Sequence, residues 1–253
     1  MCAACAGAAG YLLGDRQGVR RTETRAPAIT STNASRDRVQ PDGLFRVRTH
    51  EKVVAMTFDD GPDDRYTQHV LDVLAGVSAS ATFFQIGVNA QADPALAKAV
   101  LHAGHTIGNH TFDHAELELL HSAGIESEID RGEEALVSVG LPRPNLFRPP
   151  KGYTDEAVGI LADAARYKTV FWGMCVEAFV DHQDIGLGVD TMLDRVRPGE
   201  ILLAHDGGHV VGVADRPVLS RERTMEALPL LLKGLVQRGY RVVDVPTLLD
   251  LGR

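Results

Sequence analysis

From about residue 51, short runs of apolar and β-branched residues alternate with longer amphipathic segments. The short runs predict strands at Lys52–Phe58, Ala81–Ile86, His105–Asn109, Asn145–Arg148, Lys168–Gly173, Glu200–Ala204 and Arg241–Val245. The amphipathic segments predict helices at Tyr66–Leu74, Pro94–Ala103, Gly124–Ser138, Asp155–Ala165 and Arg223–Arg238. This alternation is typical of an α/β protein with a parallel sheet, either closed as a barrel or open and doubly wound.

The first fifty residues lack this periodicity and are rich in Ala, Thr, Ser and Arg. They carry eight Arg and four acidic residues, whereas the rest of the chain is strongly acidic. We interpret residues 1–50 as an arm or linker and residues 51–253 as one domain. The basic arm suits either an anionic cell envelope or, as the plainer alternative, a solvated tail.

Composition narrows the class of protein. The chain has 253 residues, 44% of them hydrophobic and 24% charged, with a net charge of -8. This balance argues against a nucleic-acid partner, and no apolar run reaches the length of a membrane span. We expect a monomer. Cys2–Gly14 resembles the apolar part of an export signal without its basic start, so we expect a secreted or cell-envelope protein, with a cytoplasmic location as the alternative.

Two acidic residues end the first predicted strand. Asp59 and Asp60 are followed by Gly61 and Pro62. Adjacent side chains of a regular strand point to opposite faces, so the two carboxylates have different surroundings. One can bind a cation while the other accepts a proton; a helix cap would explain only one of them.

The third predicted strand leads into a pair of histidines, His110 and His114. Residues at i and i+4 share one face if the segment is helical, so both rings could reach one metal ion. Together with Asp60 they make two imidazoles and one carboxylate. Three protein ligands with an open position are typical of a catalytic zinc or a similar divalent ion.

Two further polar residues follow predicted strands. Arg148 precedes Pro149 and Pro150, which restrict the backbone, and an arginine there could hold a carboxylate. His205 leaves an apolar strand for a glycine-rich loop, where it could be a core residue or a proton donor. All these sites follow strand carboxyl ends, where parallel α/β barrels collect their chemistry.

Four motifs resemble those of the NodB-type polysaccharide deacetylases, carbohydrate esterase family 4. They are TFDDGP at Thr57–Pro62, H-T-x-x-H at His110–His114, RPPKG at Arg148–Gly152 and L-x-H at Leu203–His205. The resemblance extends over nearly all of residues 52–253. It implies a distorted, incompletely closed (β/α)7 TIM-like barrel and a hydrolase that removes N-acetyl groups from a glycan such as peptidoglycan or chitin.

The resemblance also implies the central residue roles. Asp60, His110 and His114 would bind a divalent metal, usually zinc, with cobalt or another divalent ion as alternatives. Asp59 would be the general base, held by Arg148.

The remaining roles concern the leaving group and the substrate. His205 would protonate the leaving amine, the backbone N–H of Lys151 would bind the oxyanion, and Leu203 would line the acetyl-methyl pocket. Further substrate contacts are expected from Lys151, Gly152, Tyr153 and Trp172.

The chain departs from the family pattern at two places. Lys151 stands where an aromatic residue is usual, and we hypothesise that its charge favours an anionic sugar such as N-acetylmuramic acid. Ala178 and Phe179 stand where an Asp-Trp pair usually tunes the catalytic histidine. Glu177 or Asp181 could supply the missing carboxylate, and the sequence leaves both possible.

Several alternative functions remain open at this stage. The same scaffold could deacetylate or deformylate a small molecule, or remove O-acetyl groups from xylan. A catalytically inactive carbohydrate-binding module is a third class. Asp59, His110, His114 and His205 together argue against the inactive module, because binding alone does not need a base beside a metal ligand.

Overall fold

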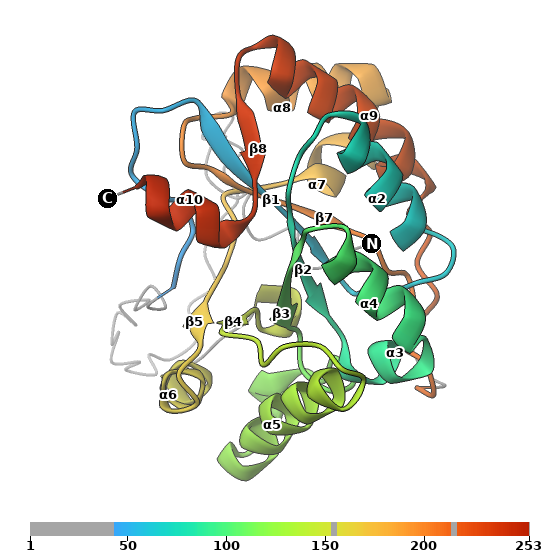
Figure 1. The fold of residues 1–253 in the computed structure, drawn as a ribbon, viewed down its shortest axis with the longest axis vertical. Helices are drawn as coiled ribbons and strands as arrows, with labels where there is room; N and C mark the ends of the chain where they lie inside the picture. Colours follow the sequence, from blue (N-terminus) through green and yellow to red (C-terminus); the bar gives the residue numbers. More distant parts are fainter. Residues whose placement is uncertain (1–42, 153–155, 214–216, 253) are drawn as a thin grey trace, which may run out of the picture.

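The computed structural model describes residues 43–152, 156–213 and 217–252 (Figure 1). Its strands are β1 Val53–Asp59, β2 Thr82–Gln85, β3 Thr106–Asn109, β4 Leu146–Phe147, β5 Lys168–Thr169, β6 Met174–Cys175, β7 Ile201–His205 and β8 Arg241–Val243. Its α-helices are α2 Thr67–Gly76, α3 Gly87–Ala92, α4 Pro94–His102, α5 Ser122–Ser138, α6 Glu156–Ala164, α7 Val176–Val180, α8 Ile185–Arg195, α9 Glu222–Gln237 and α10 Val245–Leu251.

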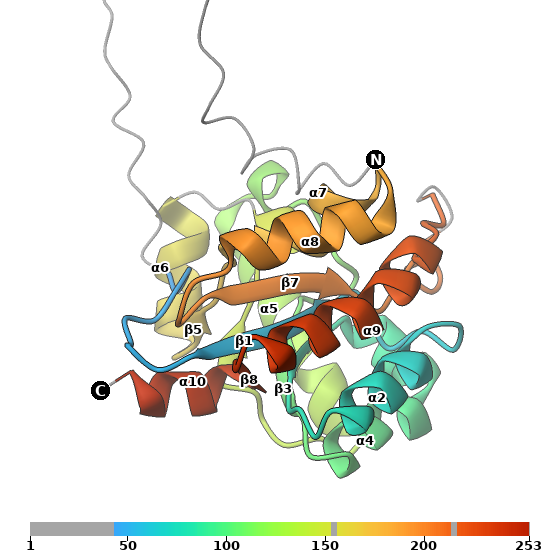
Figure 2. The ribbon, with the colours of Figure 1, turned by 90° about the horizontal axis from the view of Figure 1, so that it is seen from above.

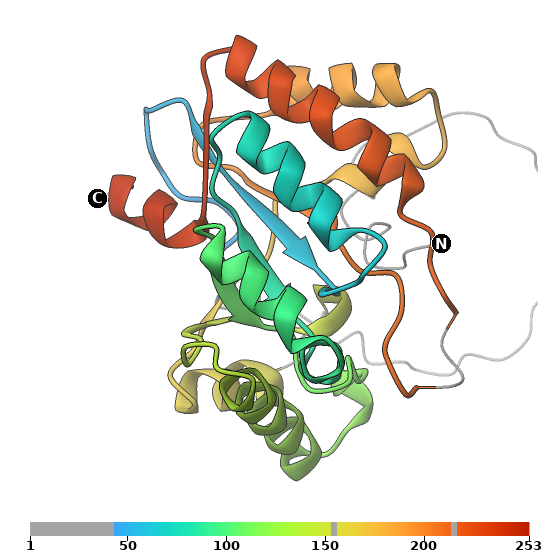
Figure 3. The ribbon, with the colours of Figure 1, turned by 45° about the vertical axis from the view of Figure 1, so that its right-hand side comes forward.

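The strands form one curled parallel sheet in the order β5-β4-β3-β2-β1-β7-β6, with β8 beside β1. Figure 3 shows α9, α2 and α4 in a row across the outer face of the sheet, and Figure 2 shows α8 and α9 next to β7 and β1. The β5 and β6 ends of the sheet do not pair in the described residues. The predicted incomplete barrel in a single domain is therefore confirmed.

The central strand, β1, shows that the sheet is buried on both faces. All seven residues of β1 are buried, and β1 pairs with β2 on one side and β7 on the other. A parallel strand covered on both faces reads as a continuous apolar run rather than an alternating one. From the side of the helices, α9 contributes Leu228, Leu231 and Leu232 to the core, and all three are fully buried.

The predicted strand Lys168–Gly173 was wrong in extent. It ends after two residues as β5, and a separate short strand, β6, follows it. The carbonyl groups of Val170 and Phe171 accept hydrogen bonds from the guanidinium of Arg148 at 3.0 Å each. A side chain therefore takes the acceptors that would have continued the ladder.

The predicted last strand was also too long. It ends at Val243 because the Asp244 side chain accepts from Thr247 N at 3.0 Å, which caps α10, and Pro246 occupies the first turn. Four short helices, α3, α7, α8 and α10, were not predicted. Three of them have seven residues or fewer, too short for a clear apolar period.

A second apolar cluster closes the inside of the half-barrel at the amino ends of the strands. Its members come from β1, β2, β4 and β7 and from α10, including Val53, Phe84 and Leu248. Leu44 and Arg46, from the segment predicted to be an arm, form bridges with Val170 and Glu200 and cover the same end. Apolar side chains thus fill the barrel at the amino ends of the strands, and the polar residues predicted for the site follow the carboxyl ends. Within the described ranges, no helix combines the length and apolarity needed to cross a membrane.

Candidate active site

The polar residues singled out by the sequence meet at the carboxyl edge of the sheet. Asp59 is the last residue of β1, His110 follows β3, Arg148 follows β4 and His205 is the last residue of β7. The registers place Asp59 opposite His205, so residues 146 positions apart become neighbours. Parallel strands point their carboxyl ends the same way, which explains the convergence.

Arg148 holds Asp59. Its Nη1 donates to Asp59 Oδ1 at 2.7 Å and to Thr57 Oγ1 at 2.9 Å. The guanidinium is fully buried against the ring of Phe84, at 4.2 Å. Burial lowers the pKa of Arg148 while the charge of Asp59 opposes the shift, and the pair is therefore a compensated one. Asp59 Oδ2 faces the neighbouring imidazole, 3.8 Å from His110 Nε2.

Asp60, His110 and His114 form a compact group of ligand atoms. Asp60 Oδ1 lies 3.5 Å from His110 Nε2 and 3.3 Å from His114 Nε2. This oxygen is buried and makes no hydrogen bond in the described part of the chain. Burial opposes ionisation of Asp60, but the two imidazoles outweigh it and hold its pKa well below the usual range.

The hydrogen bond of His110 fixes its tautomer. Nδ1 lies 2.7 Å from the carbonyl oxygen of Arg148, which can only accept, so Nδ1 carries the proton. The lone pair is then on Nε2, on the side of Asp60. A backbone carbonyl behind a metal-binding imidazole is the usual support for such a ligand. An unpartnered carboxylate oxygen and two imidazoles fit a zinc-like divalent ion.

The two histidines do not lie on one helix face, so the helical arrangement that their spacing left open is not the one adopted. Thr111 and His114 both have left-handed backbones, with φ of 68° and 61°. Asn109 Oδ1 accepts from Thr111 N at 2.9 Å, and Thr111 Oγ1 accepts from His114 N at 3.1 Å. These local bonds hold an irregular loop that brings the rings within 5.0 Å between centroids.

Glu177 places a carboxylate beside His205, where Ala178 and Phe179 provide none. Its Oε1 lies 3.1 Å from His205 Nδ1 and accepts from His205 N at 3.1 Å and from Thr224 Oγ1 at 2.9 Å. Burial raises the pKa of Glu177, but the charge of His205 outweighs it and the net pKa is lowered. Asp181, the other candidate, is exposed at the end of α7.

The expected substrate residues lie around the same edge. Lys151 has a left-handed backbone (φ 60°) and its ammonium pairs with the carboxylate of Glu116. Gly152 lies against the ring of Trp172, where a Cβ would come within 2.4 Å of a ring carbon. Leu203 is fully buried two residues before His205, on the same face of β7. Tyr153 lies outside the described residues.

Two residues of the site were missed in the sequence. Arg221 Nη2 donates to Asp60 Oδ2 at 3.0 Å, and Asp206 accepts from Thr67 Oγ1 at 2.7 Å. Burial raises the pKa of Asp206 to about 7, against the hydrogen bond from Thr67 and with the charge of Asp60 adding to it. Asp206 follows His205 directly, which was a usable signal. Arg221 lies 161 positions from its partner Asp60, and nothing in the sequence around it signals this contact.

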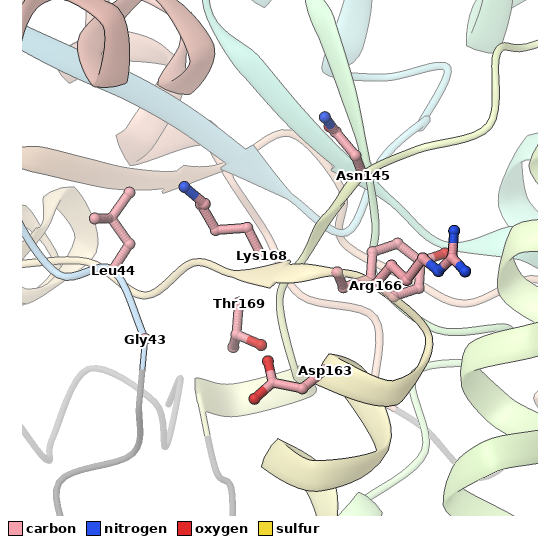
Figure 4. A pocket seen from close by; sticks show the side chains of 8 residues that line it. Gly43, Leu44, Asn145, Asp163, Arg166, Lys168 and Thr169 are labelled. Atoms are coloured by element: carbon pink, nitrogen blue, oxygen red, sulfur yellow. The ribbon is translucent and has the colours of Figure 1, made fainter.

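A surface hollow of about 520 Å³ lies elsewhere (Figure 4). It is lined by residues before and at the start of β4 and β5, including Asn145, Arg166 and Lys168. These are the amino ends of the strands, whereas the acidic and histidine side chains follow the carboxyl ends. The hollow and the candidate active site are therefore separate.

Comparisons with known proteins agree with the geometry. The sequence profile described as "Polysaccharide deacetylase" matches residues 46–170. A peptidoglycan-N-acetylglucosamine deacetylase of Bacillus cereus is 38% identical over 85% of this chain and 97% of its own length. A chitooligosaccharide deacetylase of Sinorhizobium fredii is 33% identical over 76% of this chain and 90% of its own. The crystal structure of the Bc1960 peptidoglycan N-acetylglucosamine deacetylase superposes with a TM-score of 0.73, at 28% identity over 83% of this chain and 93% of that one.

Proposed function

The chain belongs to the polysaccharide deacetylase family, and from this premise we propose that it hydrolyses N-acetyl groups of peptidoglycan, primarily on N-acetylglucosamine units. The observation that carries the proposal is the meeting of a held carboxylate, a metal-type ligand set and a carboxylate-backed histidine at one edge of the sheet. Chitin-like oligomers are the second candidate substrate, supported by the similarity to a chitooligosaccharide deacetylase.

Asp59 is the proposed general base. Arg148 donates to Oδ1 and holds the carboxylate in place, while Oδ2 is directed toward His110 and the ligand group. Oδ2 would accept the proton of the attacking water. A divalent ion held by Asp60, His110 and His114 would supply Lewis acidity for the acetyl carbonyl and the water.

His205 is the proposed general acid. Amide hydrolysis breaks the carbon–nitrogen bond, and the departing amine must receive a proton before it leaves as the free sugar amine beside acetate. Glu177 at Nδ1 favours the protonated ring and fixes its orientation, which leaves Nε2 for the proton transfer. The Lys151 N–H is the proposed oxyanion donor, on a turn supported by Trp172.

The ion pair between Lys151 and Glu116 bears on which sugar the site favours. The Lys151 ammonium is partly offset by Glu116, so it presents less net positive charge than the sequence alone suggests. This pairing favours a neutral N-acetylglucosamine unit over the anionic muramic unit. A peptidoglycan substrate also implies that the protein works in the cell envelope, which cell fractionation with an antibody to the chain would test.

The proposed function is tested by acetate release. The full chain, loaded with zinc or cobalt, would be assayed on peptidoglycan, chitin oligomers and acetylxylan, with Asp59→Asn as the inactive control. We expect release from peptidoglycan that falls by about 10³-fold in the variant. Release from acetylxylan alone, or from no polymer by a metal-loaded chain, would overturn the proposal and favour an O-deacetylase or a small-molecule amidase.

A further inference from the structure

The start of α9 reaches into the candidate active site. Arg221 is the residue immediately before this helix, and its side chain is 4% exposed. Its Nε donates to the carbonyl oxygen of Gly207 at 2.8 Å, and its Nη2 donates to Asp60 Oδ2 at 3.0 Å. One planar guanidinium thus joins the loop after β7 to the carboxylate of Asp60, the residue directly after β1.

This contact divides the two oxygens of Asp60 between different partners. Oδ2 belongs to Arg221, whereas Oδ1 faces His110 and His114 and is buried without a hydrogen bond within the described residues. The backbone of Asp60 is left-handed, with φ of 77°, and its carbonyl oxygen accepts from Asn89 Nδ2 at 3.0 Å. Backbone and side chain are therefore both fixed, with a single oxygen directed at the two imidazoles.

We propose that Arg221 is a positioning residue that makes Asp60 a one-oxygen metal ligand. The inference deepens the proposed function, because it concerns the same metal group. Thr224, in the first turn of α9, donates to Glu177. The start of this helix therefore contacts two carboxylates of the site, Asp60 through Arg221 and Glu177 through Thr224. Without Arg221, Asp60 could turn its second oxygen inward and alter the coordination geometry.

Charge and positioning predict opposite effects on metal affinity. A guanidinium beside a divalent ion repels it, so removing the charge alone would tighten binding. Loss of a supporting hydrogen bond to a ligand typically weakens metal binding about 10- to 100-fold. The sign of the change in dissociation constant therefore separates the two roles.

The chain offers a matched control two residues along. Arg223 lies in the first turn of α9 and, like Arg221, joins this end of the helix to another segment, since its guanidinium donates to Val180 O at the end of α7 at 2.9 and 2.6 Å. Among the described residues, its guanidinium makes no hydrogen bond or ion pair with Asp60, His110 or His114. Arg223→Gln therefore removes a comparable anchor of the helix and leaves the ligand group untouched.

The test measures metal binding by metal-free protein. Zinc would be titrated into the wild-type chain, Arg221→Gln, Arg221→Lys and Arg223→Gln by competition with a chromophoric chelator, and the visible spectrum of bound cobalt would report coordination geometry. Circular dichroism would check folding. Lysine keeps the charge but has no fork to reach Gly207 O and Asp60 Oδ2 together.

We expect Arg221→Gln to raise the zinc dissociation constant about 10- to 100-fold and to change the cobalt spectrum. Arg221→Lys should show a smaller change of the same sign, and Arg223→Gln should stay within about twofold of wild type. Equal or tighter zinc binding by both Arg221 variants, or the same loss in Arg223→Gln, would overturn the inference. If the wild-type chain itself bound no metal, the proposed function would fail instead.

Discussion

The two halves of the candidate active site are built in different ways. The half that holds the proposed general base, here called the base half, takes Asp59, Asp60, His110 and Arg148 from the ends of β1, β3 and β4. The half that holds the proposed general acid, here called the acid half, consists of His205 from β7 and its partners from α7 and α9. Both halves bury a carboxylate, and each carboxylate faces a cationic group.

The difference lies in the kind of cation. Asp59 pairs with a guanidinium, which keeps its charge across the whole range in which proteins fold. Glu177 faces an imidazole, which gains and loses its proton near neutral pH. The cationic partner of Asp59 therefore keeps its charge at every working pH, whereas we expect the cationic partner of Glu177 to contribute to the pH response of the enzyme. Four substitutions would break or sharpen this contrast.

The largest effect is expected from removing a ligand in the base half. His110→Ala takes away one imidazole of the ligand group and should lower both zinc affinity and acetate release by about 10³-fold or more. Chelator competition and the acetate assay measure the two quantities. His209→Ala is the control, because that ring is 37% exposed in the loop after β7. Similar losses in both variants would mean that removing any imidazole near the site has this effect, and would count against His110 as a metal ligand.

In the acid half, Glu177→Gln keeps the shape and the acceptor oxygen but removes the charge. The protonated form of His205 is then less favoured, so the alkaline limb of kcat/KM should move to lower pH. Its maximum should fall about 10²-fold. A full pH–rate profile at saturating metal checks both. Asp181→Asn, at an exposed position, should leave the profile unchanged, and an unmoved alkaline limb in Glu177→Gln would count against the assigned roles.

The turn after β4 can be tested with a pair of glycines. Gly152 and Gly140 both have φ near the left-handed region, at 67° and 90°, so Ala at either costs about 1 kcal/mol of stability. Only at Gly152 does the new Cβ strike the ring of Trp172. We expect about tenfold lower kcat for Gly152→Ala and no change for Gly140→Ala. Denaturant unfolding measures the stability cost, and the acetate assay measures kcat. Equal kcat in the two variants would contradict a specific role for the contact between Gly152 and Trp172.

The smallest effect on chemistry, and a distinct one on stability, concerns Asp206. Its pKa in the folded chain is about 7, above the value of about 4 for an unfolded Asp. Between these values the folded state binds the extra proton, so the stabilising contribution is full below about pH 4 and is lost as pH rises through about 7. The contribution of this proton to the free energy of unfolding, lost over this pH range, is on the order of 4 kcal/mol at most.

Asp206→Asn removes this proton and keeps an acceptor for Thr67. The free energy of unfolding of the metal-free variant should therefore gain on wild type as pH rises from about 4 to about 8. Urea titrations of both proteins at several pH values give that difference. A difference that stays constant with pH would show that Asp206 is ionised throughout.

Much of the base half could be predicted from sequence because its chemistry is local. Asp59 and Asp60 are adjacent, the two histidines are four apart, and each group directly follows an apolar strand. The backbone at Thr111 shows the limit, because the spacing of the histidines did not decide whether the segment is helical, and the hydrogen bonds from Thr111 N to Asn109 Oδ1 and from His114 N to Thr111 Oγ1 hold an irregular loop.

The acid half depends on contacts between distant segments. Glu177 and His205 are 28 positions apart and Thr224 is 47 from Glu177, so no spacing rule distinguishes Glu177 from Asp181. The fold class was accessible because strand–helix alternation is periodic. The split of β5 and β6 was not, since the guanidinium of Arg148 decides it from another strand.

The packing of α10 has a practical consequence for attaching the protein to a surface. Val245 and Leu248 lie in the interior cluster with Val53, at the amino ends of the strands, and the ligand group lies at the opposite edge. A bead or resin coupled just beyond Leu251 would therefore sit behind the molecule. Immobilised this way, the protein would present its catalytic edge outward, toward a substrate too large to diffuse around it.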